Sequence, residues 1–108
     1  MEVHFHAHHA DVSEHMRKRA EREIRRAALR IPRVVEAIVR FEQDGAVRRV
    51  TVTLRAPQHH DLVASAEGRW FGPALSLAVS RLRTQASRER NALPKGRARQ
   101  LARERSRA

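Results

Sequence analysis

The 108-residue chain contains no cysteine, only four glycines and few aromatic residues. The absence of cysteine excludes disulfides, thiolate-bound zinc and cysteine nucleophiles, and it fits a reducing cytosol. No apolar run is long enough for a transmembrane helix, and the first ten residues lack the lysine or arginine of a signal peptide. We therefore expect a cytoplasmic protein that has no membrane among its partners.

Signatures of enzymes and cofactor sites are also missing from the sequence. It has no nucleophile elbow, no phosphate-binding glycine loop, no dinucleotide fingerprint and no metalloprotease helix motif. Its glycines are not clustered, and its carboxylates are scattered among basic residues. We therefore predict a protein that is not an enzyme, with no catalytic residues, no cofactor and no small-molecule substrate.

Positive charge is what the chain has in excess, with a formal net charge of +11. Residues 11–33 and 68–93 each carry a net charge of +4, and residues 94–108 carry +5. The middle of the chain, residues 34–67, carries −1. A generally arginine-rich composition would spread the charge evenly, so this clustering favours a polyanionic partner.

Two hydrophobic periodicities alternate along the chain. Apolar residues at every second position, typical of half-buried strands, predict strands at 3–8, 35–42, 49–55 and 62–67. Spacings of three and four indicate two amphipathic helices, one ending near Pro32 and one running from Phe71 to about Asn91. Asp11 or Ser13 is the expected cap of the first helix, and Asp44-Gly45 is the expected core of a hairpin turn.

This element order predicts the fold class. A helix between the first two strands requires a parallel, right-handed crossover, and the short connections that follow predict an antiparallel meander. The expected architecture is an α+β, β-α-β-β-β-α two-layer sandwich, in which two helices pack on one face of a four-stranded mixed sheet. Residues 1–93 form the predicted domain, and residues 94–108 form a basic tail that we expect to be disordered when free.

Basic residues on the outer sides of the two helices are the candidate binding site. Arginine suits phosphate because its planar guanidinium donates two parallel hydrogen bonds. The simpler interpretation is a solvated helix face with local ion pairs such as Glu21–Arg25, but four acids cannot neutralise the eight bases of residues 11–33. The predicted RNA-binding residues are Arg17, Lys18, Arg22, Arg25, Arg26, Arg81, Arg83, Arg88 and Arg90.

Aromatic residues are too few to form an array that stacks bases. The three phenylalanines fall on core stripes, so recognition is expected through the RNA backbone and shape. Trp70 lies at a strand-to-helix junction, where a lid on the edge of the core is favoured over a stacking role. His4, His6 and His8 share one side of the first strand, but no third ligand is fixed by spacing, so no metal site is predicted.

Several strings resemble one known family, the ribosome hibernation promoting factors, which include the ribosome-associated inhibitor type. The resemblance covers residues 1 to about 93. It rests on VSE at 12–14, VTVTL at 50–54, ASAEG at 64–68 and ALSLAVSRL at 74–82, followed by Gln85, Arg88 and Arg90. It implies binding to the small ribosomal subunit and its ribosomal RNA, in the channel used by messenger and transfer RNA. Such binding silences idle ribosomes and protects them.

The resemblance also implies which basic residues contact RNA. The positions that match commonly basic sites of the family pattern are Arg17, Arg26, Arg81, Arg88 and Arg90. The chain departs from the pattern at Arg69–Pro73, which replaces an acidic-then-aromatic string, and at Glu23, where a basic residue is frequent. It lacks the C-terminal dimerisation domain of the long members, so pairing of ribosomes through that domain is not expected.

Two other functions stay open at the level of sequence. A general module for structured RNA would depend more strongly on the basic tail. A protein-interaction or metal-responsive module would use the open face of the sheet and its histidines.

Overall fold

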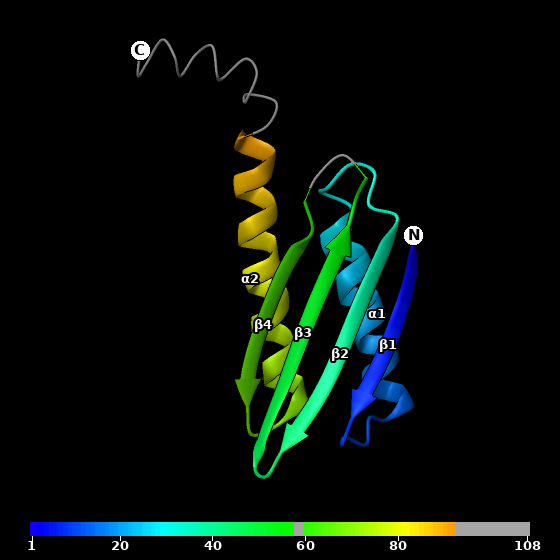
Figure 1. Ribbon diagram of the computed structural model, residues 1–108, viewed down its shortest axis with the longest axis vertical. Coiled ribbons are helices and arrows are strands. Elements are labelled where there is room, and N and C mark those ends of the chain that lie inside the picture. Colours follow the sequence, from blue (N-terminus) through cyan, green and yellow to red (C-terminus); the bar gives the residue numbers. More distant parts are fainter. Residues whose placement is uncertain (58–59, 93–108) are drawn as a thin grey trace.

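The computed structural model describes residues 1–57 and 60–92 of the chain. Its elements are β1 (Glu2–His8), α1 (Glu14–Ala28), β2 (Glu36–Asp44), β3 (Val47–Arg55), β4 (Leu62–Gly68) and α2 (Phe71–Ala92). Figure 1 shows both helices on one side of a single sheet, each beginning at the end of the molecule where β1, β2 and β4 finish. The predicted β-α-β-β-β-α sandwich is therefore confirmed.

The four strands lie in the order β1-β2-β3-β4. β1 is parallel to β2, and the other two pairings are antiparallel, as a single crossover followed by a meander requires. The β2–β3 turn contains Gly45 at φ 64°, a left-handed conformation that glycine adopts without a steric penalty. This glycine closes the hairpin directly beyond the Asp44–Val47 pair.

One face of the sheet forms the core together with the helices. Alternate residues of the central strands, such as Val39 and Val52, are 0% exposed, and so is Ile24 of α1. α2 contributes Leu75 and Leu82, which are also fully buried. Because strand side chains alternate between the two faces, the intervening residues lie on a second face that neither helix covers.

The boundaries of α1 follow from local hydrogen bonds. Ser13 is the N-cap, since its Oγ accepts a hydrogen bond of 3.1 Å from the Met16 amide. The regular helix ends at Ala28, earlier than the sequence suggests. Beyond it, the amides of Leu29 and Ile31 donate to carbonyls only three residues back. This tighter winding satisfies the last carbonyls of the helix before Pro32.

Two side chains of α2 form hydrogen bonds with the backbone of β4. Arg81 Nη1 donates to the Ser65 carbonyl at 2.7 Å, and Gln85 Nε2 donates to the Val63 carbonyl at 2.6 Å. Both contacts lie four residues apart on α2 and two apart on β4, so the helix follows the strand along its length. The flank of α2 that holds Arg81 is therefore turned toward β4.

Two further predictions concern the ends of the chain and membranes. In the part of the chain that the structure describes, no helix is long and apolar enough to cross a bilayer. The basic tail, residues 94–108, lies outside the described residues, so its separation from the domain remains a prediction.

Two leucines of α2 provide a matched test of this packing. Leu82 is 0% exposed and Leu77 is 42% exposed. We expect Leu82→Ala to lower the free energy of unfolding by about 2–5 kcal/mol, because it opens a cavity in the core. Leu77→Ala should cost on the order of 0.5 kcal/mol. Urea unfolding followed by circular dichroism measures both values, and equal losses would contradict the difference in burial between the two leucines.

Candidate nucleic-acid interface

Three cations of α1 form a ridge on the outer side of the helix. Lys18, Arg22 and Arg26 are all exposed, and their spacing of four residues gives a rise of about 6 Å from one to the next. Among the side chains that the structure describes, no carboxylate lies at ion-pair distance from any of the three. We call these three residues the α1 ridge. Its charge is available to an external anion.

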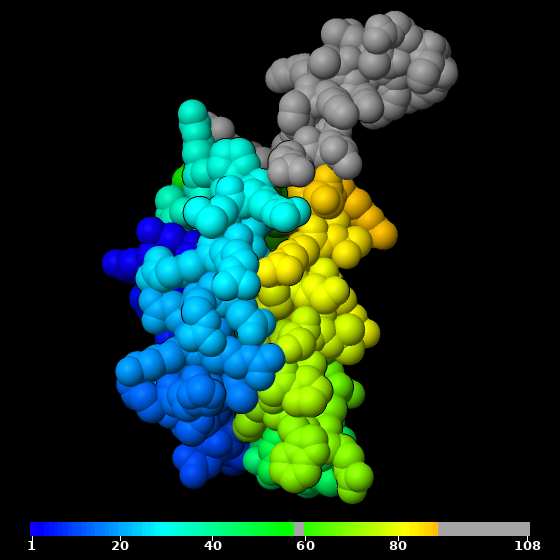
Figure 2. All heavy atoms as spheres, turned by 180° about the vertical axis from the view of Figure 1, so that it is seen from behind, coloured from blue at the N-terminus to red at the C-terminus, as the bar shows by residue number. Residues whose placement is uncertain are grey.

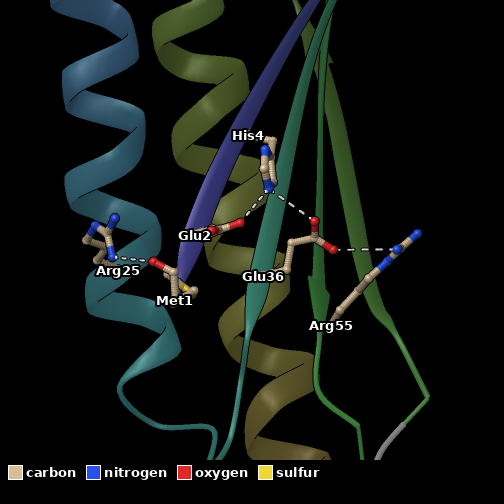
Figure 3. Close-up of polar contacts among 6 residues, drawn as sticks. All are labelled: Met1, Glu2, His4, Arg25, Glu36 and Arg55. Atoms are coloured by element: carbon tan, nitrogen blue, oxygen red, sulfur yellow. Dashed lines mark hydrogen bonds and ion pairs between the residues drawn. The ribbon is translucent and has the colours of Figure 1, made fainter.

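Arg25 differs from the ridge although it was predicted with it. Its Nη2 lies 2.9 Å from Glu21 Oε2, and its Nη1 donates to the Met1 carbonyl at 3.0 Å. Figure 3 shows Arg25 reaching from α1 to the start of β1. The charge of Arg25 is locally compensated. The simpler interpretation of the sequence, a helix-face ion pair between Glu21 and Arg25, is therefore correct for this residue. Arg17 is exposed in the first turn of α1.

The basic residues of α2 lie on two different flanks of the helix. Ser76 of α2 contacts α1 through Arg19. Arg83 is seven residues after Ser76, which is about two helical turns, so Arg83 also lies on the flank toward α1. Arg81 lies about 200° from Arg83 around the helix, and its guanidinium is bound to β4. Arg88 is exposed, and the side chain of Arg90 lies outside the described part of the chain.

Arg19, which is not among the predicted residues, joins the two helices. Its Nε donates to Glu23 Oε2 at 2.7 Å, and its Nη2 donates to Ser76 Oγ of α2 at 2.7 Å. Arg19 lies at the border of the apolar stripe, four residues before Glu23. This spacing is the feature of the sequence that could have predicted the Arg19–Glu23 ion pair. The acid at Glu23, a departure from the family pattern, therefore holds a guanidinium that links α1 to α2.

Figure 2 shows the surface that results from this arrangement. α1 and α2 lie side by side along the molecule and form one continuous face. The α1 ridge and Arg83 both belong to the outer surfaces of these helices, whereas Arg25 and Arg81 are tied down on their far flanks. The structure thus brings together part of the predicted set and separates the rest.

The open face of the sheet carries charges that pair with one another. Arg49 binds Glu67 through its Nε and Nη2, and this hydrogen bond raises the pKa of Arg49 above its ordinary value. Arg55 lies 3.5 Å from both Glu36 and Asp61. Ion pairs of this kind leave little net charge on the sheet. The excess positive charge of the described domain is therefore on the helices.

One histidine of β1, His4, contacts acids of the sheet. His4 Nε2 lies 3.1 Å from Glu36 and 3.4 Å from Glu2, and Figure 3 shows it between the two carboxylates. Among the described residues, no group of three or more histidine, cysteine, aspartate and glutamate side chains is placed to hold a metal ion. His4 is thus engaged with carboxylates of the sheet.

The side chain of Trp70 does not cover the edge of the core, although its position in the sequence predicts that it does. It is 65% exposed, so the prediction of a lid over the edge of the core is wrong. Phe71, the next residue, occupies the core position at 9% exposure and contacts Phe41 edge to face. Because Phe71 begins α2 and points into the core, Trp70 is turned outward.

Two solved structures share this architecture. The ribosomal subunit interface protein from Coxiella burnetii has a TM-score of 0.77 at 19% identity, over 83% of this chain and 98% of its own. The N-terminal domain of Thermus thermophilus Protein Y has a TM-score of 0.71 at 20% identity, over 82% of this chain and 98% of its own. At these identities the likeness shows the fold.

Sequence comparison identifies the family. No curated protein matches the chain in sequence. Residues 3–93 match the family described as Sigma 54 modulation protein / S30EA ribosomal protein, which confirms the resemblance carried by the sequence strings. Because the match covers nearly all of the predicted domain, the chain belongs to the Sigma 54 modulation protein / S30EA ribosomal protein family.

Proposed function

We propose that this protein is a ribosome hibernation factor that binds the RNA of the small ribosomal subunit. It would occupy the channel of messenger and transfer RNA, inhibit translation and protect idle ribosomes. Its family is ribosome-associated, which implies action in the cytoplasm. The observation that carries the proposal is the contrast between the ion-paired sheet and the α1 ridge, which has no acidic partner among the described residues.

The proposed mechanism is binding rather than catalysis. Each cation that contacts a phosphate releases counterions from the RNA, which drives association. A rigid two-helix face presents these cations at fixed spacing, so it recognises the path of the RNA backbone. A domain held in the channel by such contacts excludes messenger and transfer RNA from the same space. Inhibition of translation then requires only that the protein occupies the channel.

A second candidate function is a general module for structured RNA. It is favoured by residues 94–108, which carry a net charge of +5 in sequence. A tail of this kind adds affinity for any polyanion without selecting one. The two candidates therefore differ in whether the helices or the tail dominate binding.

Co-sedimentation tests the ribosomal partner. When a stationary-phase lysate is separated on a sucrose gradient at low salt, we expect the protein in the fractions that contain small subunits. Raising the salt should release it, because log affinity falls by about 0.7–0.9 per log unit of salt for each phosphate contact. Recovery of the protein at the top of the gradient, even at low salt, would refute the proposal.

Two arginines on opposite faces test which face binds. Arg26 belongs to the α1 ridge, and Arg40 is exposed on the open face of the sheet. We expect Arg26→Ala to weaken binding to isolated small subunits and to lower the salt slope by about 1. Arg40→Ala removes the same charge and should leave the slope unchanged. Equal effects of the two variants would show that binding follows net charge and not the helix face.

Deletion of residues 94–108 separates the two candidate functions. For a hibernation factor, the deletion should weaken binding to small subunits while leaving it measurable. For a general RNA module, it should abolish binding to an arbitrary RNA duplex. Electrophoretic mobility shifts with small subunits and with the RNA duplex, at one salt concentration, measure how much affinity the deletion removes for each.

A further inference from the structure

Trp70 is an exposed aromatic residue at one end of the two-helix face. It lies between β4 and α2, and 65% of its surface is accessible. Tryptophan is usually well buried because its large apolar ring gains from leaving water. It is also the single tryptophan of a chain that has no tyrosine. An indole exposed to solvent at this position is therefore a candidate contact for a binding partner.

The position of the indole ring is defined by its neighbours. The guanidinium carbon of Arg48 lies 5.3 Å from the Trp70 ring centroid and 5.7 Å from that of Phe71. Arg48 is fixed in turn, because its Nη1 donates to the Arg69 carbonyl. Phe71 is anchored in the core. A cation–π contact thus supports one side of the indole, and the large exposed fraction leaves much of the ring accessible.

The surroundings of Trp70 carry positive charge. Arg48 contacts the ring, Arg69 is the exposed residue before it, and the first turn of α2 has no acid. Glu67, the nearest acid before it in sequence, is bound to Arg49. Arg19 of α1, although paired with Glu23, also reaches the start of α2, since its Nη1 lies 3.2 Å from where a Cβ on Gly72 would be. Arg48 and Arg69 therefore extend the positive charge of the two-helix face to this corner.

We propose that Trp70 is a stacking platform for one unpaired nucleobase of the bound RNA. The base would stack on the accessible part of the indole, while Arg48 and Arg69 lie near the flanking phosphates. An accessible ring beside guanidinium groups is the arrangement that proteins use to hold unstacked bases. This inference rests on the proposed function and refines it. The protein recognises a single-stranded or looped nucleotide in addition to the phosphate backbone.

Binding to isolated small subunits tests the proposal. Trp70→Ala should weaken binding by about 5- to 150-fold, the effect of losing one base–aromatic stack. Trp70→Phe keeps a ring and should retain most of the affinity. Val63→Ala is the matched control, because Val63 is an apolar residue with 47% exposure on the open face of the sheet. It should bind as the unaltered protein does.

A labelled single-stranded RNA and its abasic counterpart distinguish stacking from a structural role. The abasic strand keeps every phosphate but offers no base. We expect the unaltered protein to prefer the strand with bases and Trp70→Ala to lose that preference. Because the chain has one tryptophan and no tyrosine, its emission reports on Trp70 alone. It should be quenched by the strand with bases and much less by the abasic strand.

The possible failures are distinguishable. If Trp70→Ala binds small subunits as tightly as the unaltered protein, or if the two strands bind and quench equally, the stacking platform is refuted. Ribosome binding would then stand on phosphate contacts alone. If the unaltered protein binds neither small subunits nor RNA, both the stacking platform and the proposed function are refuted.

Discussion

The burial of one face of the sheet beneath two helices is the constraint on which the structure depends. Strand residues alternate between faces, so placing Val39 and Val52 in the core commits their neighbours to the opposite face. The helices meet a similar requirement with Ile24 and Leu82. Charged residues of the helices then lie on their outer sides, and most charged residues of the strands lie on the far side of the sheet. The fold thereby divides the charges into two populations.

These two populations behave differently toward an anion. On the sheet, Arg49 and Arg55 face carboxylates of neighbouring strands, so the fields of these charges largely cancel at a distance. On α1, the residues Lys18, Arg22 and Arg26 have no such partners in the described part of the chain. Since exposed charges act over about 8 Å at physiological salt, only the helix side attracts a polyanion at close range. The distribution of charge therefore gives the molecule a preferred orientation toward a polyanion.

Sequence reasoning reached the fold because hydrophobic periodicity and turn chemistry are local signals. All six elements and the Asp44-Gly45 hairpin were predictable for this reason. The candidate site was only partly predictable. A helical repeat shows that Arg25 and Arg81 avoid the core, but their contacts with Met1 and Ser65 depend on how the helices dock on the sheet. The outward turn of Trp70 likewise depends on Phe71 taking the core position.

The hydrogen bonds from α2 to β4 have a consequence for self-association. An exposed outer strand offers unpaired carbonyls and amides, to which a strand of another molecule can add. In this chain Arg81 and Gln85 already occupy the Val63 and Ser65 carbonyls of the outer strand β4. The strand of a second molecule would have to displace these side chains to pair with both carbonyls. Arg81 and Gln85 therefore disfavour the addition of a strand at the β4 edge of the sheet.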